Sequence, residues 1–204
     1  FGVDNNILWL PDVFGYSAAL PQILKKNGID WFVTTKIGWN DTNMMPYDTF
    51  MWKGIDGSKI HTFITQEYTT EMTPSKMFEK WSMNCEKEDV PAVMVAYGHG
   101  DGGGGPTKEM LENHKRMACG LPGFPKTKMD SLKNFMERTY SSFRANAESL
   151  KRCPKWVGEV YLEKHRGVYP SIAKVKKNNR TAEQLYQTLE ALSVTDKVLL
   201  GLPY

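Results

Sequence analysis

The sequence predicts an α/β fold, and two observations lead to this prediction. Short runs rich in aromatic and β-branched residues, typical of buried strands, alternate with stretches whose apolar residues recur at helical spacing. In addition, two apolar runs are each followed by an aspartate and glycine, with Asp12 after the first run and Asp101 after the fifth. In α/β proteins the active site commonly forms at the carboxyl ends of the strands, which makes both aspartates candidates for chemistry.

The predicted strands and helices follow one another along the chain. The strands are expected at residues 6–10, 30–35, 49–53, 59–65, 92–97 and 156–162. Helices are expected at residues 17–26, from Thr73 onward, at 107–119 and at 130–151. The helix at Thr73 begins well, because threonine is a favoured N-cap and the following Pro74 suits the first helical position.

The pattern changes in the last part of the chain. From about residue 178, apolar side chains recur at the spacing of one helix face: Ala182, Leu185, Leu189 and Leu192. We therefore expect two domains, with residues 1–170 forming an α/β domain and residues 171–204 opening a helical one. Because both ends of the chain lie on apolar runs, we also expect it to be a piece of a longer protein.

Composition argues against two classes of partner. The formal net charge of +3 is too small to indicate nucleic acid, and the basic run near Lys176 is expected to be a solvated surface. No run of eighteen apolar residues is present, so no membrane span is predicted. The three cysteines are widely spaced and match neither a metal-binding pattern nor a disulfide framework, which favours a reducing compartment.

Asp12 lies in the sequence Leu10-Pro11-Asp12-Val13-Phe14-Gly15, between the first predicted strand and the first predicted helix. A carboxylate at this point is well placed for chemistry at a strand end. The alternative is structural: Asp12 caps the following helix or closes the turn. Position alone favours neither interpretation.

Asp101 lies in the glycine-rich stretch from Gly98 to Gly105, which includes four consecutive glycines. Glycine carries a high entropic cost in a folded chain, so such a run favours close approach of a ligand to the backbone. The same stretch fits the dinucleotide fingerprint G-x-G-x-x-G, which gives a nucleotide-binding α/β domain as the alternative function. That fingerprint also needs an acidic residue after a second strand, where this chain has Pro122 and Pro125.

Two carboxylates on strand ends suit glycoside hydrolysis, in which one acid attacks the anomeric carbon and the other protonates the leaving oxygen. Aromatic rings that suit sugar faces are also present, although core packing is the better explanation for most of them. These rings are Trp9, Trp31, Trp39, Tyr47 and Trp52. His165 follows the last predicted strand, and by itself a lone histidine is more often a satisfied or exposed side chain than a ligand.

Five stretches, in order and spanning nearly the whole chain, resemble glycoside hydrolase family 38, the class II α-mannosidases. They are residues 10–24, 32–37, 46–57, 100–107 and 158–169. The similarity is to the branch with cytosolic, vacuolar and bacterial members, which implies a cytoplasmic location, with the vacuole or lysosome as the alternative. It implies a fold as well: part of a seven-stranded α/β barrel-like catalytic domain, followed by the first helix of a helical bundle.

The resemblance also implies roles for individual residues. Asp12 matches the catalytic nucleophile and a zinc ligand, Asp101 matches the acid/base, and His165 matches a second zinc ligand. Tyr47 resembles a tyrosine that contacts the sugar. The implied substrate is a terminal non-reducing α-D-mannose residue of an oligosaccharide or N-glycan, and homo-oligomerisation is left open.

One departure bears on the metal. The family's upstream His-x-Asp motif, which supplies two more ligands, is absent from this sequence. Since a zinc site needs three or four protein ligands, Asp12 and His165 cannot form one alone. We therefore expect these 204 residues by themselves to be inactive.

Overall fold

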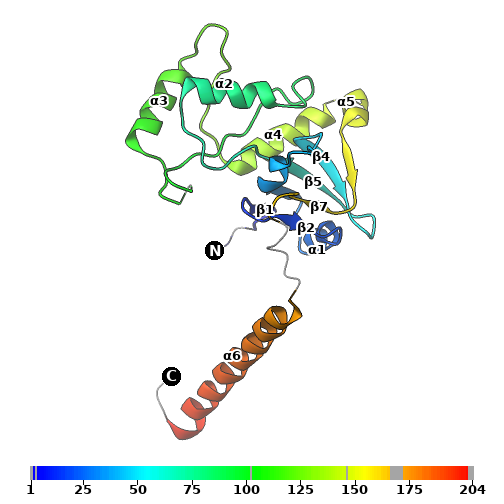
Figure 1. The fold of residues 1–204 in the computed structure, drawn as a ribbon, viewed down its shortest axis with the longest axis vertical. Coiled ribbons are helices and arrows are strands. Elements are labelled where there is room, and N and C mark those ends of the chain that lie inside the picture. The colour runs from blue at the N-terminus through cyan, green and yellow to red at the C-terminus, as the bar shows by residue number, and fades with distance from the viewer. Residues whose placement is uncertain (1, 3, 102, 146, 166–171, 202–204) are drawn as a thin grey trace. The chain divides into compact units, whose positions relative to one another are not determined.

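A computed structural model of the chain describes residues 2, 4–101, 103–145, 147–165 and 172–201 (Figure 1). The chain divides into two compact units, residues 1–164 and residues 165–204. The domain boundary predicted after residue 170 lies outside the described residues, so that division stays a prediction. None of the described helices combines the length and the apolar character needed to cross a bilayer.

The first unit is built on a five-stranded sheet with the spatial order β1-β3-β5-β4-β6. Its strands are β1 (Ile7–Leu10), β3 (Trp31–Thr34), β4 (Thr49–Lys53), β5 (Lys59–Ile64) and β6 (Lys155–Val157). β1, β3 and β5 are parallel to one another, and β4 is antiparallel to β5. A second, two-stranded sheet pairs β2 (Gly15–Tyr16) with β7 (Val160–Tyr161). The predicted α/β class is therefore confirmed, whereas closure into a seven-stranded barrel stays a prediction.

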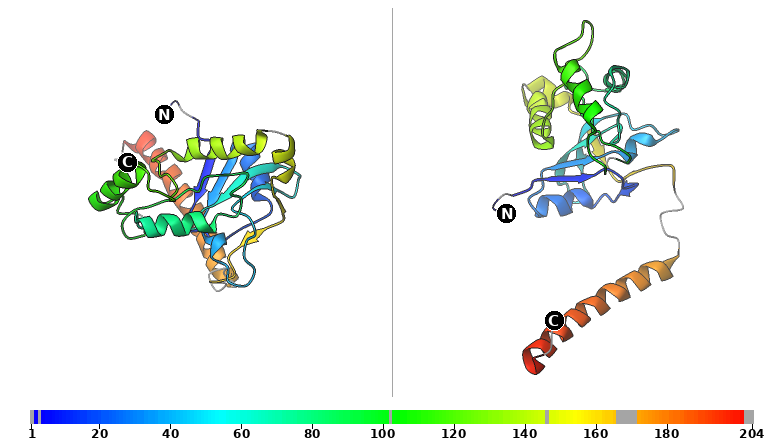
Figure 2. Two further views of the ribbon diagram at one scale, coloured as in Figure 1. Left: turned by 90° about the horizontal axis from the view of Figure 1, so that it is seen from above. Right: turned by 90° about the vertical axis from the view of Figure 1, so that its left-hand side faces the viewer.

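The helices of the first unit lie around this sheet (Figures 1 and 2). They are α1 (Leu20–Lys26), α2 (Pro74–Met83), α3 (Lys108–Ala118), α4 (Leu132–Arg144) and α5 (Ala147–Arg152), with a 3₁₀ helix η1 (Lys36–Trp39) after β3. The threonine N-cap predicted for α2 is confirmed, because the Thr73 hydroxyl accepts a hydrogen bond from the backbone N–H of Lys76. The second unit contains α6 (Ala173–Leu200).

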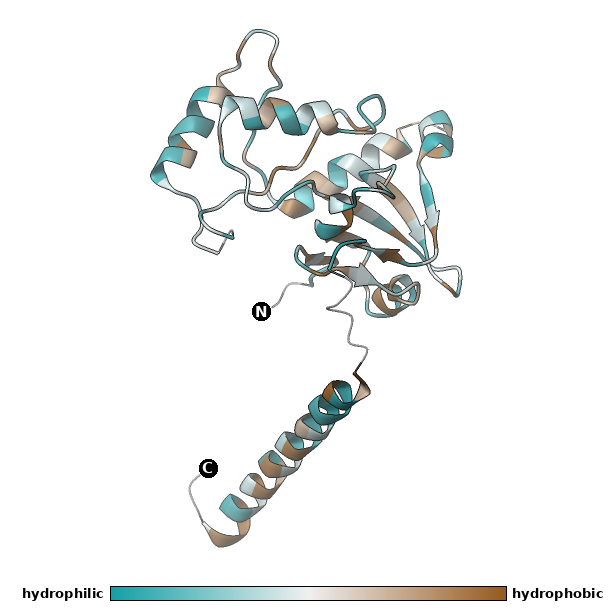
Figure 3. Ribbon diagram, viewed as in Figure 1, coloured by the Kyte–Doolittle hydropathy of each residue, from teal (hydrophilic) through white to brown (hydrophobic). Residues whose placement is uncertain are grey.

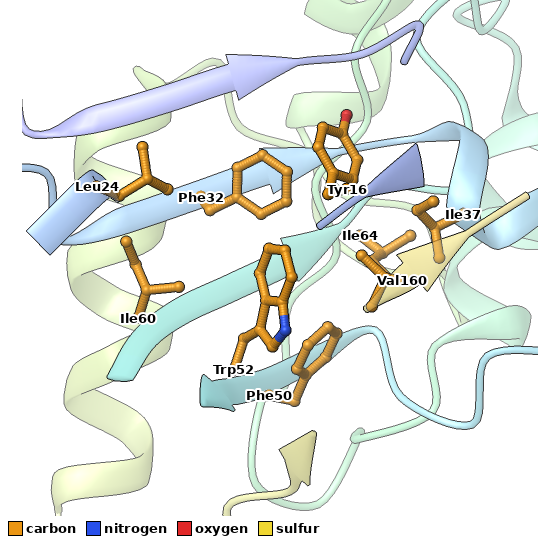
Figure 4. Close-up of a cluster of buried hydrophobic side chains, with 9 residues drawn as sticks. All are labelled: Tyr16, Leu24, Phe32, Ile37, Phe50, Trp52, Ile60, Ile64 and Val160. Atoms are coloured by element: carbon orange, nitrogen blue, oxygen red, sulfur yellow. The ribbon is translucent and has the colours of Figure 1, made fainter. Parts of the chain in front are cut away.

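Alternating residues of the central strands bury both faces of the sheet, as the period of two in a strand requires. One face forms the cluster shown in Figure 4, in which α1 contributes one side chain: Tyr16, Leu24, Phe32, Ile37, Phe50, Trp52, Ile60, Ile64 and Val160. The other face packs against α4 through Trp31, Val33, Phe63, Phe135 and Met136. Along the strands in Figure 3, brown hydrophobic stretches alternate with paler and teal ones.

Two of the predicted strands differ from the structure. Residues 92–97 form no strand, and Tyr97 alone makes an isolated bridge, with Thr70. A strand needs a neighbour to complete its hydrogen-bond ladder, and none of the described strands is paired with this segment. The predicted strand at 156–162 is divided into β6 and β7, because Gly158 adopts a left-handed conformation with φ of 110°.

Candidate active site

The candidate site lies where the three parallel strands end. Leu10, Thr34 and Ile64 are aligned in register across β1, β3 and β5. The loops that follow carry Asp12 after β1, Lys36 after β3 and Tyr68 after β5. Because the carboxyl ends of parallel strands meet at one edge of the sheet, three side chains distant in sequence come together.

Hydrogen bonds hold the loop that carries Asp12 on both sides. The buried Tyr16 hydroxyl donates to the carbonyl of Leu10 at 2.9 Å and lies 2.8 Å from the hydroxyl of Thr34, which joins the ends of β1 and β3. On the far side of the loop, the carbonyl of Phe14 accepts from the N–H of Leu162 at 2.6 Å. The N-cap of α1 is Ala19, so Asp12 does not cap that helix.

Two donors meet one oxygen of the Asp12 carboxylate. The Lys36 ammonium lies 3.2 Å from Asp12 Oδ1, and the Tyr68 hydroxyl donates to the same Oδ1 at 3.1 Å. Within the described part of the chain, no partner is found for Asp12 Oδ2. The carboxylate is 62% exposed, whereas the Lys36 side chain is only 7% exposed. One oxygen is therefore held and the other has no partner among the described residues.

Trp39 completes this arrangement. The Lys36 ammonium lies 3.2 Å from the centroid of the Trp39 ring, a close cation–π contact. The indole N–H of Trp39 donates to the carbonyl of Gln66 at 3.2 Å, which fastens η1 to the end of β5. The ring therefore forms one wall around the ammonium group.

The loop that carries Tyr68 is held by α2. The Lys80 ammonium, which is nearly buried, lies 3.1 Å from Glu67 Oε2. The carbonyl of Glu67 also accepts from the Thr65 hydroxyl at 2.8 Å, at the end of β5. These two contacts fix the residue next to Tyr68 and so help to define where its hydroxyl points.

Asp101 lies in an exposed turn of the glycine-rich loop. The loop closes on itself, because the N–H of His99 donates to the carbonyl of Gly105 at 2.8 Å and the N–H of Gly104 donates to His99 at 3.2 Å. A Cβ at Gly104 would meet the His99 carbonyl oxygen at 3.1 Å, so any larger residue there would require a small shift of the closed loop. Among the described residues, no hydrogen bond or ion pair joins Asp101 to Asp12 or to any other side chain.

Tyr47 takes no part in the contacts given for Asp12. Tyr47 is half-buried and packs against the core cluster of Figure 4. The segment that leads to His165 is anchored by Glu163, whose carboxylate accepts from the backbone N–H groups of Asp41 and Thr42 at 3.0 and 2.9 Å. These hydrogen bonds hold the pKa of Glu163 below its usual range. His165 is exposed, with a left-handed φ of 59°. The predicted roles of Tyr47, His165, Asp12 and Asp101 remain predictions.

The residues present do not make a complete metal site. No group of three or more His, Cys, Asp or Glu side chains in the described ranges is arranged to hold a metal ion. The donors predicted from the sequence, Asp12 and His165, are fewer than the three or four that zinc requires from a protein. The described residues thus offer at most part of a zinc site.

A cavity lies elsewhere in the first unit. It has a volume of about 960 Å³ and is lined mainly by apolar side chains next to residues 91–97, including Trp9, Trp81 and Phe135. It contains neither Asp12 nor Asp101. The carboxylates are therefore the better guide to the chemistry.

Sequence reasoning missed Lys36 and Tyr68. Lys36 is an ordinary lysine after a strand, and Tyr68 follows the next parallel strand by several residues, so neither forms a motif with Asp12. The alignment of Leu10, Thr34 and Ile64 brings them together, and this register is not visible in the sequence. A weak signal was available, because each of the three residues follows a predicted strand.

Comparison with known proteins identifies relatives over nearly the whole chain. The sequence model for the glycosyl hydrolases family 38 N-terminal domain matches residues 1–159. Alpha-mannosidase 2C1 of Homo sapiens is 37% identical over 195 residues, which are 95% of this chain and 18% of that protein. The alpha-mannosidase of Saccharomyces cerevisiae is 36% identical over 205 residues, covering 98% of this chain and 19% of that protein.

A solved structure supports the fold. The crystal structure of an alpha-mannosidase from Enterococcus faecalis V583 matches with a TM-score of 0.51 at 13% identity, over 78% of this chain and 18% of that one. At this identity the likeness concerns the fold alone. The chain spans about a fifth of the length of the curated relatives it matches.

Proposed function

We propose that this chain, which belongs to glycosyl hydrolase family 38, forms part of the catalytic domain of a longer, retaining α-mannosidase. Its substrate would be a terminal non-reducing α-D-mannose residue of an oligosaccharide or N-glycan. The relatives named above are alpha-mannosidases, which supports this substrate class. The nucleotide-binding alternative is not favoured, since its fingerprint must directly follow a strand and the described residues just before Gly98 form none.

One observation carries the proposal: the carboxylate of Asp12 is held by one oxygen, while its other oxygen has no partner among the described residues and the side chain is 62% exposed. A nucleophilic carboxylate needs a fixed orientation and one oxygen that can reach the anomeric carbon. An aspartate that only closed a turn would direct its oxygens at nearby backbone N–H groups. Asp12 instead contacts two side chains from other strand ends.

In the proposed mechanism, Asp12 attacks the anomeric carbon while Asp101 donates a proton to the departing glycosidic oxygen. A covalent mannosyl-enzyme results. Asp101 then takes a proton from a water molecule, whose oxygen displaces Asp12 from the anomeric carbon. Two displacements at one carbon restore its configuration. The exposed, glycine-rich loop that bears Asp101 suits a group that must meet both a sugar and water.

In this proposal the chain would supply only some of the protein ligands of a zinc ion. Asp12 and His165 would supply two ligands, and the longer enzyme would have to supply the others. When bound, the metal would act as a Lewis acid toward sugar hydroxyls. The described residues alone do not fit a closed site, so no step of the mechanism is assigned to the metal.

The test uses the full-length enzyme and a 4-nitrophenyl α-mannoside. Asp12→Asn is expected to abolish turnover, and Asp101→Ala is expected to lower it by about 10²–10⁴-fold. Azide should then restore turnover of an activated substrate by Asp101→Ala and give α-mannosyl azide, because azide replaces water at the covalent intermediate. Formation of β-mannosyl azide by this variant, or full activity of Asp12→Asn, would contradict the assigned roles.

A further inference from the structure

The nearly buried ammonium of Lys36 raises the free energy of the folded state. Its side chain is 7% exposed, and Asp12 is its ion-pair partner within the described ranges. Taking an ammonium group out of water is costly, and one exposed carboxylate compensates for that cost poorly. Stability alone therefore gives a weak reason for a lysine at this place.

The surroundings of Lys36 fix its direction. The ammonium lies 3.2 Å from the centroid of the Trp39 ring and 5.0 Å from that of the Tyr68 ring, so two aromatic faces bound it. The same ammonium lies 3.2 Å from Asp12 Oδ1. The Tyr68 hydroxyl reaches the same oxygen from another strand end. Both donors thus act on one oxygen of the nucleophile proposed above.

We infer that Lys36 and Tyr68 are positioning residues that bind Asp12 Oδ1 and thereby direct Oδ2 to the anomeric carbon, with Lys36 acting mainly in the second step of the reaction. The inference rests on the proposed function. It assigns to these two residues a role that they perform through Asp12.

The step assignment follows from charge. In the first step the Asp12 carboxylate forms a bond from Oδ2 to the anomeric carbon and loses its negative charge. In the second step water attacks that carbon, the carbon–Oδ2 bond breaks with its electron pair returning to Asp12, and the water proton passes to Asp101. A cation beside Oδ1 stabilises the returning charge. Removing it slows this second step more than the first, in which the same cation opposes loss of charge from Asp12.

The experiment uses the full-length enzyme with Lys36→Met and a 2,4-dinitrophenyl α-mannoside, whose good leaving group makes the first step fast. We expect kcat to fall by about 10- to 100-fold, the loss expected for a charged hydrogen bond. KM should fall in parallel, because the covalent intermediate accumulates. A burst of dinitrophenol and a mannosylated Asp12 peptide in the mass spectrum should accompany this change. Lys36→Arg, which keeps the charge, should recover part of kcat.

Lys25→Met is the matched control, since it removes an exposed lysine that is paired with Asp30 far from this loop. Tyr68→Phe removes a single hydroxyl and should lower kcat in the same sense if Lys36→Met does not fold. An unchanged kcat in both variants, or a fall in kcat with unchanged KM and no trapped intermediate, would overturn the inference. Failure of the proposed function is a separate result, because the unmodified enzyme would then not cleave the mannoside.

Discussion

His61, on β5, is a buried titratable side chain with no role in the proposed chemistry. Neither of its ring nitrogens has a hydrogen-bond partner among the described residues, and its ring packs 5.0 Å from Tyr140 and 6.2 Å from Phe143, between centroids. Burial lowers the pKa of His61 to about 4. The folded protein therefore keeps this histidine neutral at a pH where the unfolded chain would take up a proton.

This depressed pKa predicts acid sensitivity. The unfolded chain binds a proton near pH 6.5 and the folded protein only near pH 4, so stability is lost as pH falls from 6.5 to 4. The loss should reach roughly 3 kcal/mol at 1.4 kcal/mol per pKa unit. His61→Phe should remove this dependence. Hydrogen-exchange protection of the β5 amides at pH 7 and pH 5 measures it, and an equal loss of protection in His61→Phe would contradict the prediction.

At the residue level, the sequence predicted Asp12 as a candidate site residue but did not predict which side chains contact it. The apolar run, Pro11, Asp12 and Gly15 are close together in the sequence, so this short stretch by itself indicates a carboxylate at a strand end. The contacts of Asp12 with Lys36 and Tyr68 depend on which strands are neighbours and in what register. That information is non-local, since it arises from packing of the whole sheet, and no single stretch of sequence contains it.

At the level of elements, sequence patterns confined to one turn of a helix predicted the structure correctly. The N-cap predicted at Thr73 is confirmed, because a cap depends on residues three positions apart, and the helix predicted at residues 107–119 is observed as α3. The strand predicted at 92–97 is wrong for the opposite reason, because its apolar residues are present but a partner strand is not. The break between α4 and α5 was also missed, since the sequence there contains no proline or glycine.

The cap of α3 gives a prediction at this scale. The Thr107 hydroxyl accepts from the N–H of Met110 at 3.2 Å, directly after the loop that bears Asp101. Thr107→Ala should destabilise α3 by about 1 kcal/mol. Thr107→Ser, which keeps the hydroxyl, should retain most of that stability. Hydrogen exchange of the α3 amides distinguishes the two variants, and equal loss of protection in both would mean that the threonine methyl group, not the cap, is what matters.

At the scale of the whole molecule, the two units differ in how they bury apolar surface. The first unit has a core on both faces of its sheet. The second contains α6, a helix of 28 residues with no buried side chain among those described. Its apolar residues include Leu185, Leu189 and Leu192, which lie on one face and are each more than half exposed. The helix thus has the amphipathic pattern of a bundle member.

The last prediction concerns that helix. If α6 is the first helix of a bundle in a longer enzyme, its apolar face is covered there by other helices, as amphipathic helices of globular proteins generally are. Leu189→Asp in the full-length enzyme should then cost about 2–5 kcal/mol, comparable with loss of a buried leucine. Glu190→Gln, at the neighbouring exposed position, is the control and should change stability by less than about 0.5 kcal/mol. Chemical denaturation measures both variants. Equal stability of the two would mean that the leucine face stays in solvent, and the bundle expected from the sequence would have to be abandoned.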